Sequence, residues 1–160
     1  MTEVKLISES LFNTVADAAS ESPRRRMNHN FHSGRADNPH RFLNVLLLGT
    51  YIRPHRHLDP PKSETFLVLE GTADVILFDD CGAIRARHRL GADSPQGRIW
   101  GVDLAAGIWH TIVARSARVI CFEVKPGPWD ASNDKDFAAW APAENDAAAA
   151  AYLQNLIEAG

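Results

Sequence analysis

The sequence contains little cysteine, no excess of positive charge and no long apolar run. Its only cysteines, Cys81 and Cys121, lie forty residues apart and form no CxxC pair, so we expect two free thiols in a reducing compartment. The net charge of −3 provides no bulk attraction to nucleic acid or to an anionic membrane. The first twenty residues contain Glu3, Glu9 and Asp17 and no apolar stretch long enough for a signal peptide or a membrane span. We therefore expect a cytoplasmic protein with no nucleic-acid or membrane partner.

The length and composition are those of one ordinary globular domain. With 160 residues, 45% of them hydrophobic and 23% charged, the chain is long enough for a single core and short for two. We expect residues 1–22 to form an N-terminal helix that packs on a barrel and residues 23–125 to form the barrel. Residues 126–160 are expected to form a wrapping loop and a C-terminal helix of the same domain.

Helical spacing occurs near both ends of the chain. Between Ser8 and Ala19 the apolar residues recur every three or four positions, and either of two serines can cap the start of this helix. The Ser22-Pro23 pair ends it, because the residue before a proline disfavours the helical region. The alanine-rich stretch from Ala143 to Glu158 predicts a second helix of high intrinsic propensity.

Short strands separated by turn signals fill the rest of the sequence. No long helical period intervenes, and turns such as EGT, DDCG and GADSPQG recur every eight to twelve residues. We expect strands at Phe42–Leu48, Tyr51–Arg53, Thr65–Leu69, Ala73–Phe78, Ile84–Leu90, Ile99–Leu104, Trp109–Ala114 and Val119–Val124. Many short strands of this spacing predict an all-β sandwich or barrel, and closure of a barrel protects strand edges.

Three histidines and one glutamate form the most informative pattern. His55 and His57 are one residue apart, so their side chains point to the same side of an extended segment. Glu64 opens the apolar run TFLVL, and His110 begins a later apolar segment just after Gly107. A single histidine near a proline is more often a surface residue, but the combination suits a divalent transition metal such as iron, zinc, nickel or manganese.

These residues resemble the two signature motifs of the cupin superfamily. In the first motif, Gly49 precedes His55 and His57, and Glu64 is followed by Gly71; the gap before Glu64 is longer than the family's usual one. In the second, only the glycine and His110 match. The resemblance implies a cupin jelly-roll β-barrel with short flanking N- and C-terminal helices, and a metal held by these three histidines and this glutamate.

Most of the chain is similar to small bacterial cupins of the WbuC family. The similar segments are SPRRRMNHNFH, GTYIRPHRH, DVILFDDCG, AGIWHTIVA, FEVKPGPWD and KDFAAWAPAE. This resemblance implies a cupin-fold metalloprotein, with genes of the family often found among surface-polysaccharide functions. It implies no particular reaction.

The segment RRRMNHNFH alternates polar residues on one face. If it is extended, Arg26, Asn28 and Asn30 share that face. One interpretation is that they line the barrel mouth and bind an anionic or sugar-like small molecule, since guanidinium groups bind phosphate and carboxylate bidentately. The other is a solvated edge strand that its charges protect from pairing.

Strand parity predicts the surroundings of the metal. If Glu64 points inward, Phe66 and Val68 do so as well, which gives a mostly apolar floor. Leu67 and Leu69 on the opposite face are also apolar, so we expect a second sheet, a terminal helix or a second subunit to cover that face, and we expect a homodimer. Glu123 and Lys125 also share a face. An ion pair in solvent at the strand end is the favoured interpretation of that pair, and a place at the pocket rim is the alternative.

The strand pattern ends at Pro126. Pro126 and Pro128 exclude pairing within a central strand and predict a loop that wraps over the barrel. Trp129, Phe137 and Trp140 are the expected packing anchors of this loop, with a lid over the cavity mouth as an alternative.

Two classes of function follow. The chain is either a metal-dependent enzyme, of the isomerase or dioxygenase type, or a non-catalytic binder or sensor of a small ligand. No residue stands out as a general base, and His29 and His32 are candidates only by their position. A metal-free epimerase is disfavoured, because all four ligand positions are filled.

Overall fold

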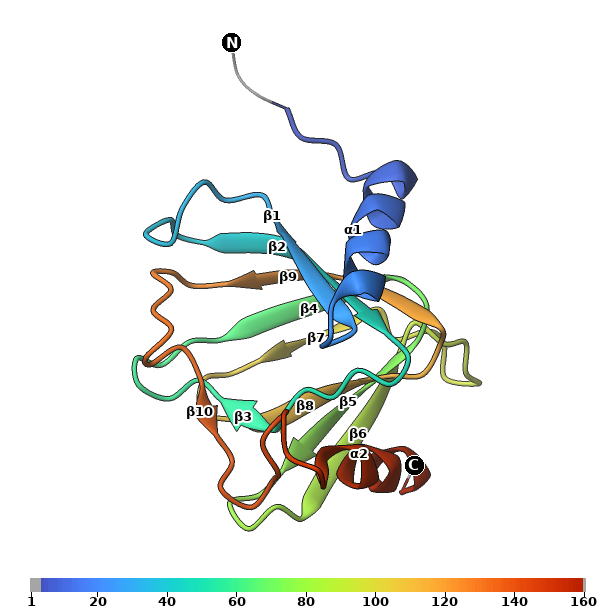
Figure 1. Cartoon of the computed structure of the whole chain (residues 1–160), viewed down its shortest axis with the longest axis vertical. Coiled ribbons are helices and arrows are strands. Elements are labelled where there is room, and N and C mark those ends of the chain that lie inside the picture. Colours follow the sequence, from blue (N-terminus) through green and yellow to red (C-terminus); the bar gives the residue numbers. More distant parts are fainter. Residues whose placement is uncertain (1–3, 160) are drawn as a thin grey trace.

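The computed structural model describes residues 4–159 and contains two antiparallel five-stranded sheets that face each other (Figure 1). The elements are α1 (Glu9–Glu21), β1 (Arg26–Asn30), β2 (His40–Leu47), β3 (His55–Arg56), β4 (Glu64–Glu70), β5 (Ala73–Phe78), β6 (Ile84–Leu90), β7 (Gly101–Leu104), β8 (Trp109–Ala114), β9 (Arg118–Lys125), β10 (Asp136–Phe137) and α2 (Ala149–Glu158). The strand orders are β1-β2-β9-β4-β7 in the first sheet and β10-β3-β8-β5-β6 in the second. This arrangement confirms the expected all-β jelly roll.

The main core lies between the two sheets. It includes Phe66 and Val68 from β4, Val75 from β5, Ile112 from β8 and Cys121 from β9. Glu64, Phe66 and Val68 are all buried, whereas Leu67 and Leu69 on the opposite face are each 43% exposed. The predicted parity of β4 is therefore confirmed.

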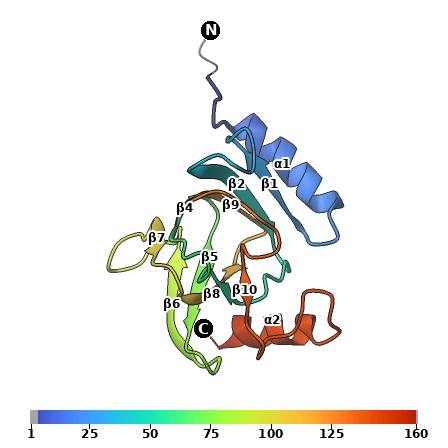
Figure 2. The ribbon, with the colours of Figure 1, turned by 90° about the vertical axis from the view of Figure 1, so that its left-hand side faces the viewer.

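Each helix covers the outer face of one sheet (Figure 2). Helix α1 packs Val15, Ala16 and Ala19 against Val45 and neighbouring residues of the first sheet. Its start is capped as expected, because the Leu11 N–H donates to the Ser8 hydroxyl. Helix α2 covers the second sheet through Leu153 and Leu156. Within residues 4–159, no helix is both long and apolar enough to cross a membrane.

Some element boundaries differ from the prediction. The C-terminal helix begins at Ala149, not Ala143, because the Asp146 carboxylate accepts the Ala148 N–H and holds a turn before the helix. Residues 51–53 lie outside any strand, and the pairing starts at β3. The C-terminal segment adds the short strand β10, which pairs with β3 and was not expected.

The C-terminal segment uses its aromatic residues in different ways. Trp140 packs against Phe78 and Trp109, with ring centroids 5.0 and 6.0 Å away, so its predicted anchoring is confirmed. Phe137 is 45% exposed, and its ring centroid lies 6.1 Å from that of His55. Trp129 lies over the open end of the first sheet, where two cavities adjoin.

Candidate metal centre

The four residues singled out in the sequence come together between the two sheets. His55 lies on β3, His57 follows that strand, Glu64 begins β4, and His110 lies on β8, where it is the register partner of His55. One ligand atom from each residue lies within 4.8 Å of the others, and all four residues are buried. The sequence spacing therefore identified a cluster that the fold assembles from both sheets.

Backbone carbonyl groups fix the orientation of all three imidazoles. Nδ1 of His55 lies 2.9 Å from the Arg53 carbonyl oxygen, and Nδ1 of His110 lies 2.9 Å from that of Ile108. Nδ1 of His57 contacts the carbonyl oxygen of Asp134 in the same way. A carbonyl oxygen only accepts, so each Nδ1 carries the proton and each Nε2 keeps a lone pair for a metal.

The atoms that face the centre of the cluster have no hydrogen-bond partners. Glu64 Oε1 lies 2.7 Å from His57 Nε2 and 3.0 Å from His110 Nε2, yet these three buried atoms are all unsatisfied. The lone pairs of the two nitrogens and the negative charge of the carboxylate oxygen repel one another unless a positive charge lies between them. The residues thus fit a cation.

The electrostatics of the cluster suit the same cation. Burial and the nearby charge of Lys135 lower the pKa of His55 well below its usual value, which keeps this imidazole neutral. Glu64 is buried among the three imidazoles and is the acidic member of the set. Neutral imidazoles with one carboxylate suggest a divalent first-row transition metal.

A cavity of about 300 Å³ lies beside the cluster and is lined by charged residues of β9 and of the loop that follows it. Glu123 and Lys125 line this cavity and are only 4% and 6% exposed. The favoured interpretation of these two residues as a solvent ion pair was wrong. Because β9 lies between β2 and β4, its inward-facing positions are buried.

Glu123 occupies the cavity wall that the sequence interpretation gave only as the alternative. Its Oε2 accepts a hydrogen bond of 3.3 Å from the Asn44 amide. Burial and the neighbouring Glu64 carboxylate raise the pKa of Glu123 to about 8. Glu123 lies two residues after the buried Cys121 of the same strand, so both side chains point to the inner face of the sheet.

Two lysines also line the cavity. Lys125 Nζ lies 3.0 Å from Asp134 Oδ2, and the same carboxylate takes Lys62 Nζ at 3.2 Å. Lys135 makes no side-chain hydrogen bond or ion pair within residues 4–159. Burial, together with the charge of Lys125, lowers the pKa of Lys135. No sequence pattern marks Lys135, which lies in an irregular loop.

The predicted ligand-binding residues separate into two places. Arg26 is 8% exposed and donates to the Tyr51 carbonyl at 2.8 Å and to Glu144 at 2.5 Å; it lines a surface pocket beside α2. Asn28 lines the cavity beside the metal cluster, and both Asn28 and Asn30 line a second pocket that adjoins it. His32 also lines that second pocket, whereas His29 lines none of these cavities.

A family model described as a domain of unknown function, DUF6016, matches residues 7–90, more than half of the chain. The chain belongs to this family. Among curated proteins, none matches the sequence.

Solved structures are similar to this DUF6016 chain in fold. The capsular polysaccharide assembling protein CapF from Staphylococcus aureus is 19% identical with a TM-score of 0.58, and the match covers 72% of this chain and 32% of that one. L-ribose isomerase from Cellulomonas parahominis, solved with L-psicose, is 14% identical with a TM-score of 0.55, covering 71% and 69%. Protein SO0799 from Shewanella oneidensis is 10% identical with a TM-score of 0.53, covering 69% and 72%. The fold is that of the cupins.

Proposed function

We propose that this chain is a metal-binding cupin that binds and transforms a small polar or anionic metabolite. One divalent ion of iron, zinc, nickel or manganese is held by His55, His57, Glu64 and His110. The observation that carries the proposal is the group of three unsatisfied buried atoms, two imidazole nitrogens and one carboxylate oxygen, that face one another.

The metal supplies Lewis acidity toward a carbonyl or hydroxyl oxygen, or, as iron, chemistry with dioxygen. The protein supplies the walls of the reaction site. Glu123 and Lys135 line the cavity beside the four ligands, so a bound metabolite contacts a carboxyl group and an ammonium group. Phe137, packed near His55, shields that side of the cavity from water.

Glu123 favours transformation over passive binding. Its carboxyl group is buried, accepts a hydrogen bond from Asn44 and neighbours Glu64. A carboxyl group in this position can exchange a proton with a metabolite that is bound beside the metal. A non-catalytic sensor of a small ligand is the alternative function, and it has no need of a buried carboxyl group at this point.

A sugar derivative linked to surface polysaccharide is the metabolite class we propose. The resemblance to WbuC-family cupins motivates it, and so do two fold neighbours, a capsular polysaccharide assembling protein and an L-ribose isomerase. The polar walls of the cavity, with Asn28 and Asn44 among them, suit hydroxyl groups.

We also propose a homodimer. Leu67 and Leu69 form an apolar strip on the outer face of β4, each 43% exposed. A second copy of the chain is the occupant that would cover this strip. Measurement of the molar mass of the protein in solution tests the dimer, and a monomeric mass at all protein concentrations would contradict it.

The test of the function combines binding and turnover. Sugars, sugar acids and hydroxy acids are screened by thermal shift against metal-loaded and metal-stripped protein, and consumption of each hit is followed by NMR. We expect hits that stabilise only the loaded protein and are consumed by it. Glu123→Gln should retain binding and lose turnover; equal turnover would remove Glu123 from the chemistry, and hits that are never consumed would favour the sensor.

A further inference from the structure

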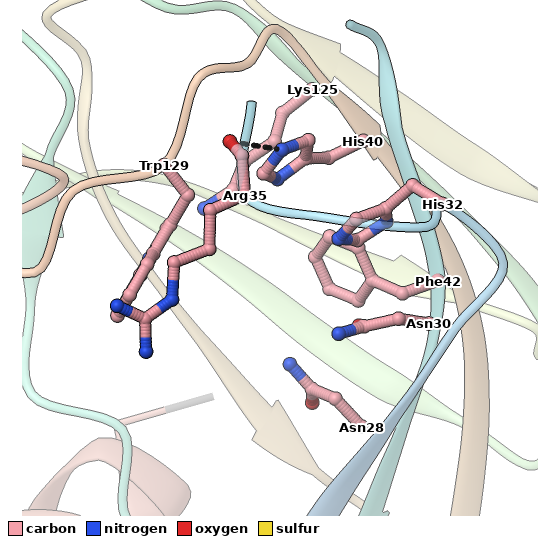
Figure 3. Close-up of a pocket in the computed structure, with 8 residues that line it drawn as sticks. All are labelled: Asn28, Asn30, His32, Arg35, His40, Phe42, Lys125 and Trp129. Carbon is pink, nitrogen blue, oxygen red and sulfur yellow. Dashed lines mark hydrogen bonds between the residues drawn. The ribbon is translucent and has the colours of Figure 1, made fainter. Parts of the chain in front are cut away.

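A second pocket adjoins the cavity beside the metal cluster. It has a volume of about 350 Å³, and Figure 3 shows the residues that line it. Its walls come from β1, β2 and the loop that joins them, and from the end of β9 and the loop after it. Asn28, Phe42, Lys125 and Trp129 line both spaces, so one elongated ligand can occupy the two together. We call this second space the outer pocket.

The outer pocket has no carboxylate among its 8 lining residues. Figure 3 shows Asn28, Asn30 and His32 extending from one wall toward Arg35 and Trp129 on the other. Two acidic groups lie nearby. Asp134 pairs with Lys62 and Lys125, whereas hydrogen bonds from Ser132 and the charge of Arg35, which makes no direct ion pair with Asp130, lower the pKa of Asp130. The lining therefore favours a negatively charged group.

The guanidinium of Arg35 makes no direct ion pair with a carboxylate among the described residues, so it can bind an anionic ligand. It lies 4.8 Å from the centre of the Trp129 ring. Arg98 stacks on Trp100 at the same 4.8 Å, but its guanidinium is neutralised by Asp93 at 3.0 and 3.2 Å. The Arg98 guanidinium therefore contacts a carboxylate and the Arg35 guanidinium does not. An oxyanion of a bound ligand would take the corresponding place beside Arg35.

Of the two histidines in the pocket, His32 adds a further donor. His32 and His40 stack with centroids 4.0 Å apart and planes 9° from parallel. Nδ1 of His32 accepts the Arg41 N–H at 3.2 Å, which places the proton of the neutral ring on Nε2 and makes Nε2 a donor for a ligand. Burial and the charge of His32 lower the pKa of His40, and an anion held between the pocket walls would offset that effect.

The walls are held in place without a ligand. The Arg35 carbonyl oxygen accepts the Trp129 N–H at 2.8 Å and lies 3.1 Å from His40 Nε2. The Gly127 N–H donates to Asn38 Oδ1 at 3.1 Å, and a Cβ on Gly127 would lie only 1.8 Å from the Asp37 carbonyl oxygen. The two loops are thus in close contact, and the pocket is pre-formed.

We propose that the outer pocket binds the phosphate group of a phosphorylated small metabolite whose other end reaches the metal centre. The inference rests on the proposed function and names its substrate class. A phosphate ester presents three terminal oxygens, which matches a bidentate Arg35, the His32 Nε2 and the amides of Asn28 and Asn30. A carboxylate, with two oxygens, would leave some of these donors without a partner.

Calorimetry with two probes, inorganic phosphate and ribose 5-phosphate, tests the proposal on native and metal-stripped protein. Both probes should bind, and unphosphorylated ribose should not displace phosphate from the stripped protein. Arg35→Ala should weaken binding about 10- to 100-fold, the loss of a charge-assisted contact. Arg98→Ala, the matched stacked arginine, should bind as the wild type does.

A second variant distinguishes loss of phosphate binding from loss of the fold. Asn30→Asp changes no volume but puts a carboxylate into the pocket, so it should abolish phosphate binding while the melting temperature stays close to that of the wild type. Absence of phosphate binding by the wild type, unchanged binding by both variants, or equal competition by acetate would each overturn the phosphate site. The metal content of the protein as purified, and its uptake of added metal, are measured separately. A protein that binds phosphate but neither contains nor takes up a metal would refute only the proposed function, whereas a protein that holds a metal but binds no phosphate would refute only this inference.

Discussion

His57 Nε2 lies 2.7 Å from Glu64 Oε1, although the two residues belong to opposite sheets. His57 follows β3 of the second sheet, and Glu64 begins β4 of the first. Since neither atom has a hydrogen-bond partner, a shared cation would convert an unfavourable contact into a bond between the sheets. Metal binding and the integrity of this end of the barrel are therefore coupled.

Asp134 should control metal affinity without being a ligand. Its backbone carbonyl contacts His57 Nδ1, and its carboxylate holds the buried ammonium groups of Lys62 and Lys125. Asp134→Ala would free the loop that orients His57, and we expect metal affinity to fall about 10- to 100-fold. Competition with a fluorescent chelator measures the affinity. Asp136→Ala, which removes only a surface ion pair with Arg56, should leave it unchanged; equal losses would refute the role of Asp134.

Asp74 should stabilise the fold and do so in a pH-dependent way. It is fully buried and pairs with Arg87, Arg89 and Arg115. Asp74→Ala should cost about 3 kcal/mol in the free energy of unfolding, at the low end for breaking a buried pair because the arginines are partly exposed. Urea denaturation measures it, with the exposed Asp93→Ala as the control.

The pH dependence of this contribution follows from the pKa. Burial would raise the pKa of Asp74, but hydrogen bonds from Arg89 and Arg87 lower it below the ordinary value of 3.8. The stabilisation is therefore fully present above pH 3.8 and disappears as the pH falls through the lower pKa of the folded state. In urea titrations the wild type and Asp74→Ala should differ at pH 7 and converge in strong acid. A constant difference across the range would contradict this account.

Gly71 and Gly97 offer a matched test of a close backbone approach. Both have positive φ, +79° and +93°, but a Cβ at Gly71 would lie 2.2 Å from the Arg118 carbonyl oxygen, whereas one at Gly97 would meet nothing within 4 Å. Gly97→Ala should cost only the left-handed strain, about 1 kcal/mol. Gly71→Ala should cost about 3 kcal/mol because steric overlap is added. Equal melting temperatures of the two variants would contradict this prediction and show that the backbone after β4 shifts to accept the methyl group without a cost in stability.

Strand parity and motif spacing predicted much of the fold and the metal cluster from sequence. Period two placed His55 and His57 on one side of an extended segment, and the resemblance to the two cupin motifs added Glu64 and His110 to them. The inward face of β4 also followed from period two. The start of α2 was missed because alanine propensity favours a helix over the whole run, while the Asp146 side chain sets where the helix begins.

The cavity walls were harder to predict. Glu123 and Lys125 are charged, so solvent exposure was the natural expectation, and only the central position of β9 in its sheet explains their burial. Arg26, Asn28 and Asn30 share a face in sequence, yet Arg26 is held by Glu144, a residue 118 positions away. Such long-range partners leave no local pattern. The WbuC resemblance and the homodimer stay predictions.

The central claim is that the three histidines and Glu64 hold one divalent metal ion. Elemental analysis by mass spectrometry, on protein purified without an affinity tag or added metal, tests it most directly. We expect close to one equivalent of a single transition metal in the wild type and in His88→Ala, and almost none in His57→Ala or His110→Ala. No metal in the wild type, or the same metal content in all four proteins, would contradict it.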